Sequence, residues 1–118
     1  MTDKKTVLIV EDDPFIAMDL EDIFQAHGYD VIGPVADVDT GFKLLEGQTP
    51  NFAMLDYNLG RETSIPLAKA LHADSVPFVF LSGQVERVII DIDLPTKRVI
   101  AKPFIPEQLL KIVDDHLV

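Results

Sequence analysis

The chain has 118 residues, a length that fits a single domain. Twenty acidic residues against ten Lys and Arg give a net charge of −10, which argues against nucleic acid or anionic lipid as a partner, since both are polyanions. The absence of cysteine excludes a disulfide framework, a thiolate zinc site and thiol catalysis. No apolar run reaches the roughly 18–20 residues of a membrane span, and residues 7–10 are too short for a signal-peptide core, so we expect a cytoplasmic protein without membrane contact.

Short apolar segments alternate with longer amphipathic ones along the chain. Residues 6–10 form a continuous apolar run, which is typical of a strand covered on both faces. Pro14 then fits the first turn of a helix, and Gly28 fits its end. Residues 31–35 predict an edge strand, because Pro34 has no N–H to donate within a sheet. The first helix is expected to bury a stripe at three- and four-residue steps, made of Phe15, Ile16, Leu20, Ile23, Phe24 and His27.

A second helix is expected after the edge strand. Asp37 or Asp39 can cap its N-terminus, and Phe42 and Leu45 are expected on its inner face. Residues 52–55 then predict a third, buried strand. All seven phenylalanines are expected in the core, at positions 15, 24, 42, 52, 78, 80 and 104.

The second half of the chain continues the same alternation. Gly60 and Arg61 predict a turn, and Pro66 lies near the start of a third helix. Residues 77–81 and 98–101 predict two more strands, and residues 106–117 a last helix. Strands that alternate with helices predict an α/β domain with a parallel sheet. The inner face of the third helix is predicted to consist of Ile65, Leu67, Ala68 and Leu71. The inner face of the last helix is predicted to consist of Leu109, Leu110, Ile112 and Val113.

Polar side chains with phosphoryl-transfer chemistry follow the predicted strands. Any one of them can be purely structural, because polar residues commonly follow strands and acidic residues favour helix N-termini. Several carboxylates at one sheet edge repel each other, and a hard cation such as Mg²⁺ relieves that repulsion. A lysine and a hydroxyl suit phosphoryl oxygens, and a carboxylate can form an aspartyl phosphate. These residues are Glu11, Asp12 and Asp13 after the first strand, Asp56 after the third, Ser82 after the fourth and Lys102 after the fifth.

Four segments resemble the signatures of the bacterial response-regulator receiver domain, the CheY-like family. They are residues 7–14, 54–59, 81–83 and 101–104, and they keep the order and approximate spacing of that family over essentially the whole chain. The resemblance implies a receiver domain over residues 1–118. Its fold is a flavodoxin-like, doubly wound parallel sheet of five strands in the order 2-1-3-4-5. The receiver is expected to fill the chain, which leaves no room for a DNA-binding output domain.

The resemblance also implies a role for the residues at the strand ends. Asp56 is the implied phosphoacceptor. Asp12 and Asp56 are implied to bind Mg²⁺ directly, whereas Glu11 acts through water. The main-chain carbonyl of Asn58 is implied as a further ligand of the metal.

The fourth and fifth strands contribute the remaining implied site residues. Ser82 and Lys102 are implied to hold phosphoryl oxygens, and the bond between Lys102 and Pro103 is implied to be cis, a form that only X–Pro bonds adopt cheaply. Asp13 is expected at the start of the helix rather than at the metal, because an acidic side chain interacts favourably with the helix dipole there.

The sequence departs from the family in its switch region. The family places an aromatic residue on the fifth strand where this chain has Val99, so the aromatic half of the usual switch is absent and Val99 is expected in the core. The family's fourth helix falls where residues 85–95 are rich in Val and Ile, so we expect an atypical or shortened helix or an extended segment. Exposed Ile89, Ile90 and Ile92 would form an interface, for example of a homodimer; the alternative is that they fold back on the core.

Two amides occupy positions that influence dephosphorylation in the family. They are Asn58, two residues after the phosphoacceptor, and Gln84, two residues after the hydroxyl residue. Both can orient an attacking water, although amides are also ordinary loop residues. We expect appreciable self-dephosphorylation.

The leading hypothesis is a phosphorylation-dependent signalling receiver. A histidine kinase or phosphotransfer protein donates the phosphoryl group, a protein interface changes, and the chain is not a conventional enzyme. The first alternative is a Mg²⁺-dependent phosphohydrolase, although such enzymes usually place a second acid where this chain has Asn58. A vestigial receiver that acts as an interaction domain is the second. A flavin-binding module is the weakest, because Glu11, Asp12 and Asp13 would repel a phosphate without a cation.

Overall fold

The computed structural model describes residues 5–84 and 99–117, which form a parallel sheet flanked by helices. The strand order is β2-β1-β3-β6-β7, which confirms the flavodoxin-like order predicted for the five strands. β2 lies at an edge, as its proline predicts. The strands are β1 (Thr6–Val10), β2 (Asp30–Val35), β3 (Phe52–Asp56), β6 (Phe78–Ser82) and β7 (Val99–Ala101).

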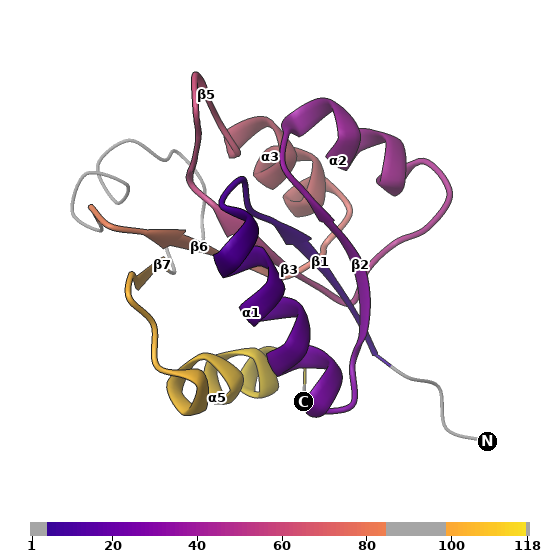
Figure 1. Ribbon diagram of the computed structural model, residues 1–118. Helices are drawn as coiled ribbons and strands as arrows, with labels where there is room; N and C mark the ends of the chain where they lie inside the picture. Colours follow the sequence, from indigo (N-terminus) through magenta and orange to yellow (C-terminus); the bar gives the residue numbers. More distant parts are fainter. Residues whose placement is uncertain (1–4, 85–98, 118) are drawn as a thin grey trace.

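Among the described residues, helices lie on both faces of the sheet (Figure 1). α1 (Pro14–Ala26) and α5 (Pro106–Leu117) lie on one face, and α2 (Val38–Leu45) and α3 (Ile65–Ala73) lie on the other. All five residues of β3 and of β6 are buried, because these strands have neighbours on both sides and helices on both faces. The continuous apolar runs in the sequence therefore indicated central strands correctly.

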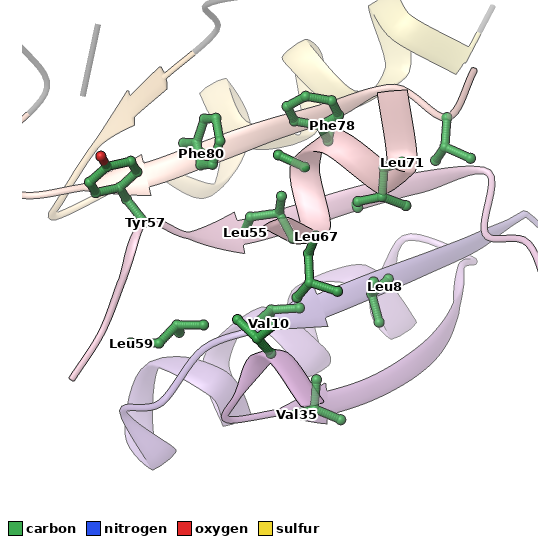
Figure 2. Close-up of a cluster of buried hydrophobic side chains, with 14 of the residues drawn as sticks. Leu8, Val10, Val35, Leu55, Tyr57, Leu59, Leu67, Leu71, Phe78 and Phe80 are labelled. Carbon is green, nitrogen blue, oxygen red and sulfur yellow. The ribbon is translucent and has the colours of Figure 1, made fainter. Parts of the chain in front are cut away.

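Alternate residues of the central strands feed two separate hydrophobic clusters. Leu8 and Leu55 face α3, where they meet Leu67 and Leu71 (Figure 2). Phe80 belongs to the same cluster, and its ring packs edge-on against Tyr57, with 5.6 Å between ring centroids. The second cluster lies under α1 and α5 and contains Val7, Ile9, Leu20, Phe24, Phe52, Met54, Val79, Leu81, Leu109 and Val113.

Aspartate side chains begin the first two helices. The Asp13 carboxylate accepts hydrogen bonds from the backbone N–H groups of Phe15 (2.9 Å) and Ile16 (3.2 Å), so Asp13 is the N-cap of α1, as expected. Asp37 caps α2 by accepting from Thr40 N–H at 2.7 Å, which decides between the two candidates for that cap.

Two phenylalanines predicted in the core are exposed. Phe15 is 79% exposed because the buried face of α1 is made of Ala17, Leu20 and Phe24, about half a helical turn away from it. Phe42 is 37% exposed.

The prediction for the inner face of α2 was correct for Leu45, which is half-buried and packs against the core, but wrong for Phe42. The inner face buries Val38 and Gly41 rather than Phe42. A Cβ on Gly41 would lie 2.8 Å from Cδ1 of Leu67, so the helix backbone approaches α3 closely at this point. Glycine carries no apolar side chain, and a count of apolar residues therefore misses it.

A small hairpin follows β3 and was not predicted beyond its turn. β4 (Asn58–Leu59) pairs antiparallel with β5 (Glu62–Thr63), and the turn contains Gly60 and Arg61, as expected. The Lys102–Pro103 bond is cis, as the family resemblance implied, and the Gly33–Pro34 bond is also cis.

The expected atypical fourth helix and the possible dimer interface in residues 85–95 lie outside the described residues. Within residues 5–84 and 99–117, no helix has the length and apolar character that a membrane crossing requires.

Candidate phosphorylation site

Three carboxylates meet at the carboxyl ends of β1 and β3. Val10 pairs with Leu55 across these two strands, so the residues that follow them, Glu11 and Asp56, come side by side. One carboxylate oxygen of each of Glu11, Asp12 and Asp56 lies within 4.8 Å of the others. Glu11 and Asp56 are nearly inaccessible, with 2% and 5% exposure, whereas Asp12 is exposed. The predicted acidic cluster therefore exists, with two buried members and one open to solvent.

Lys102 joins this cluster from the end of β7, the strand at the opposite edge of the sheet from β2. Its Nζ donates to Oε1 of Glu11 at 2.9 Å and to Oδ1 of Asp56 at 3.1 Å. Its backbone N–H donates to the carbonyl of Ser82 at 2.9 Å, which continues the β6–β7 pairing and fixes the start of the lysine side chain. The ammonium thus binds both buried carboxylates at once.

Burial and neighbouring charge disfavour ionisation of Asp56. Desolvation, followed by the hydrogen bond and the charge of Glu11, raises the pKa of Asp56 to about 8, and the charge of Lys102 opposes this only in part. Burial lowers the pKa of Lys102, but the hydrogen bonds and charges of Glu11 and Asp56 outweigh burial and raise it overall. The lysine is therefore a permanent cation, and the cluster remains short of positive charge.

Ser82 ends β6 beside this cluster and is 2% exposed. Its strand neighbour Leu81 pairs with Asp56 in the sheet. The backbone N–H of Gln84 donates to Ser82 Oγ at 2.9 Å, and a hydroxyl that accepts in this way keeps its own proton for donation.

Asn58 lies in β4 with an exposed side chain. The segment that carries it is held in several places: Asn58 pairs with Thr63, Ser64 N–H donates to the carbonyl of Tyr57 at 3.0 Å, and Val38 N–H donates to Oε2 of Glu62 at 3.2 Å. Glu62 thus connects the hairpin to the start of α2. Sequence reasoning missed this residue, because nothing near it in the chain indicates its partner.

Val99 begins β7 and pairs with Phe80. Its side chain is half-buried and packs against the cluster that contains Phe80. An apolar side chain therefore occupies the position where the family resemblance expects the switch aromatic.

The cluster offers the donor atoms that a hard divalent cation prefers. Its ligand atoms are carboxylate oxygens, and Asp12 leaves the site open to solvent on one side. A divalent cation would supply the positive charge that Lys102 alone does not provide. These residues therefore fit a cation such as Mg²⁺.

The doubly wound fold, with an acidic cluster and a lysine at the carboxyl edge of its sheet, defines a receiver domain. The family model of the response regulator receiver domain matches residues 7–114, and the chain belongs to this family. Members of the family act in phosphorylation-dependent signalling and are receivers rather than conventional enzymes.

Several relatives share the fold and part of the sequence. The solution structure of SdrG from Sphingomonas melonis Fr1 is 35% identical, with a TM-score of 0.80 over the whole of both chains. The receiver domain of PhyR from Erythrobacter litoralis is 26% identical, with a TM-score of 0.86, over 97% of this chain and 90% of that one. The phyllosphere-induced regulator PhyR of Methylorubrum extorquens is 30% identical over 114 residues, which are 94% of this chain and 43% of that protein. The chain spans about half the length of the curated relatives it matches.

Proposed function

We propose that Asp56 accepts a phosphoryl group from a histidine kinase or a phosphotransfer protein in the presence of Mg²⁺, and that the modification changes a protein interface. The observation that carries this proposal is the cluster itself: three carboxylates within 4.8 Å, two of them bound by a single lysine. A protein without metal or phosphoryl chemistry has no evident use for such an arrangement, since unrelieved repulsion between carboxylates costs stability. A cytoplasmic location is part of the proposal.

Asp12, Asp56 and the carbonyl of Asn58 would hold the Mg²⁺ ion, with Glu11 acting through water. When bound, the ion neutralises charge on the cluster and on the phosphoryl oxygens. Asp56 supplies the nucleophile. A bond forms between its carboxylate oxygen and the phosphorus, the bond from phosphorus to the donor imidazole breaks, and the imidazole leaves with the electron pair.

Lys102 and Ser82 complete the site. The ammonium of Lys102 already lies 3.1 Å from Oδ1 of Asp56, so it can bind a phosphoryl oxygen after a small movement. Ser82 donates its hydroxyl proton to another phosphoryl oxygen. Asn58 and Gln84 are the residues proposed to orient the water that later hydrolyses the aspartyl phosphate.

An apolar surface beside the site suits the protein that donates the phosphoryl group. Phe15 and Met18 of α1 are 79% and 60% exposed, and Ile105, after β7, is 50% exposed. Between α1 and the segment after β7 lies a cavity of about 440 Å³, which reaches Lys102. Asp19 and Asp22 also line this cavity, so a donor helix with apolar side chains and basic neighbours would complement it.

The test is phosphorylation by a small donor. Incubation with phosphoramidate and Mg²⁺ is expected to add one phosphoryl group, detected by intact-mass analysis, and Asp56→Asn is expected to abolish the adduct. Asp74→Asn is a matched control, because Asp74 lies at the end of α3, outside the cluster. If neither small donors nor any phosphorylated partner domain modify the wild-type chain, the proposal is wrong. Steady turnover of simple phosphate esters would favour the phosphohydrolase alternative instead.

A further inference from the structure

The edge strand β2 contains a bulge directly beside the acidic cluster. Leu8 pairs with Ile32, but Val10 pairs with Val35, so β2 has one more residue than β1 over this stretch. The bulge brings the carbonyl of Val35 to the end of β1. There it accepts a hydrogen bond from the backbone N–H of Glu11 at 2.9 Å.

Gly33 lies in the bulge, at a position that admits no other residue without displacement. Its φ is +94°, a conformation that side chains disfavour. A Cβ on Gly33 would also lie 2.9 Å from the backbone nitrogen of Val35 and 3.0 Å from the carbonyl oxygen of Ile9. Both contacts are with backbone, which cannot turn aside as a side chain can.

A Cβ on Gly33 would meet two backbone segments, and both of them hold the backbone of Glu11 in place. Ile9 lies two residues before it, and Val35 accepts its N–H. The Glu11 side chain is fixed as well, since Oε1 accepts from Lys102 at 2.9 Å and Oε2 accepts from the N–H of Asp13 at 3.2 Å. Because Glu11 is only 2% exposed, a shift of its backbone changes the position of its carboxylate in the cluster.

We propose that the bulge at Gly33 positions Glu11 for cation binding and phosphoryl transfer, which makes Gly33 a positioning residue of the phosphorylation site. This inference rests on the proposed function. It adds a residue in β2, a strand that contributes no side chain to the cluster.

The test compares Gly33→Ala with two matched glycine variants. Gly28→Ala imposes the same left-handed backbone on alanine, at φ +92°, but its Cβ would have no neighbour within 4 Å. Gly41→Ala pushes on the side chain of Leu67, in the core on the α3 side. The Mg²⁺ dissociation constant is obtained without any phosphoryl donor, from the dependence of Tm on Mg²⁺ concentration. The Mg²⁺ dependence of phosphorylation by phosphoramidate is measured separately.

Gly33→Ala is expected to raise the Mg²⁺ dissociation constant and the Mg²⁺ requirement of phosphorylation roughly tenfold, as the loss of an outer-shell partner does at other metal sites. Gly28→Ala and Gly41→Ala are expected to lower Tm but to leave the Mg²⁺ dependence of both measurements unchanged. In a Glu11→Ala background, Gly33→Ala should have no further effect on Mg²⁺ binding, because the residue it positions is gone.

The inference is overturned if Gly33→Ala lowers Tm as Gly28→Ala does while its Mg²⁺ dependence equals that of the wild type. Should Gly33→Ala unfold under standard conditions, the same comparison is made at lower temperature in trimethylamine oxide, which favours the folded state. Failure of the proposed function has a different signature: the wild type then takes no phosphoryl group from any donor, whatever the glycine variants do.

Discussion

At Asp56 two requirements conflict. A nucleophilic carboxylate must be ionised, yet Asp56 is buried beside Glu11, which disfavours its charge. Lys102 compensates in part through its contact at 3.1 Å. The negative charge that Lys102 does not compensate makes the site suited to a cation. The same unfavourable environment of the Asp56 carboxylate predicts how stability changes with pH.

The metal-free protein is expected to lose stability as pH rises from about 4 to about 8. The folded-state pKa of Asp56 is raised from 3.8 to about 8, so its protonated form is favoured in the fold at low pH, and this advantage is lost as the carboxyl ionises. Urea denaturation in EDTA across this pH range measures the effect. Asp56→Asn should flatten the profile and increase stability at neutral pH.

Saturating Mg²⁺ should restore stability at the upper end of that range in the wild type, because the ion binds only the folded state. Asp12→Ala should remove most of this restoration. If Asp56→Asn has the same pH profile as the wild type in EDTA, burial of Asp56 is not the cause of the slope.

At the scale of the elements, contacts between helices and strands decide which residues are buried. α1 buries Ala17 rather than Phe15, although the phenylalanine is far more apolar, because the helix is anchored by Leu20 and Phe24 on the same face as Ala17. The end of α5 is anchored differently, by polar groups. Asp114 accepts from the hydroxyl of Tyr29 at 2.6 Å and is 3.1 Å from Nε2 of His27.

Tyr29→Phe is expected to reduce the free energy of unfolding at pH 7 by about 1 kcal/mol, the net value of a partly exposed hydrogen bond to a charged group. The hydrogen bond from Tyr29 lowers the pKa of Asp114, so the stabilisation is present above the ordinary carboxyl pKa and is lost as pH falls through the lowered value. Chemical denaturation of wild type and variant should therefore converge in acid.

A double-mutant cycle with Asp114→Ala isolates the pair, because alanine leaves no acceptor for the Tyr29 hydroxyl. The two substitutions should be less than additive, because each removes the same contact. Additive effects would show that the Tyr29 hydroxyl does not stabilise the fold through Asp114. The ring of Tyr29, which packs edge-on against Phe24 with 5.6 Å between centroids, is retained in Tyr29→Phe and does not contribute to the difference.

At the scale of the whole molecule, the outward face of α1 and the segment after β7 lie next to each other, on either side of the cavity that reaches Lys102. Exposed apolar side chains belong to both segments. A donor protein that binds to this surface brings its phosphoryl group close to the acidic cluster, whereas a small donor reaches the cluster without binding to this surface.

The double variant Phe15→Ala with Met18→Ala is expected to leave phosphorylation by phosphoramidate and Tm unchanged, because both side chains are exposed. Transfer from a phosphorylated histidine kinase or phosphotransfer protein should slow roughly tenfold, which corresponds to about 1.4 kcal/mol of lost docking energy. Phe42→Ala is the control, since it removes an exposed phenylalanine from α2, on the other face of the sheet. Equal slowing in both variants would exclude a specific role for this face of α1.

Much of the candidate site was predictable, because the types of its residues and their positions relative to the strands can be read from the sequence. Each of these residues lies at the end of a strand or within two residues after it, and parallel strands bring their carboxyl ends to one edge. They are Glu11, Asp12, Asp56, Ser82 and Lys102. The N-cap Asp13 was predictable because its hydrogen bonds are to residues two or three positions away, and for the second helix the sequence offered Asp37 and Asp39, of which the structure shows Asp37.

The supporting contacts were not predictable, because they join segments far apart in the chain or depend on an absent side chain. Glu62 meets Val38 across 24 positions, and Asp114 meets Tyr29 across 85. Gly33 and Gly41 matter through the space they leave, which only the folded backbone reveals. The sequence alone thus indicated the strands, the helices and the candidate site residues, through local periodicity and residue type, and its resemblance to the receiver family implied the strand order. Tertiary structure decided which faces are buried and what holds the acidic cluster in place, because those depend on distances between segments that the chain does not connect directly.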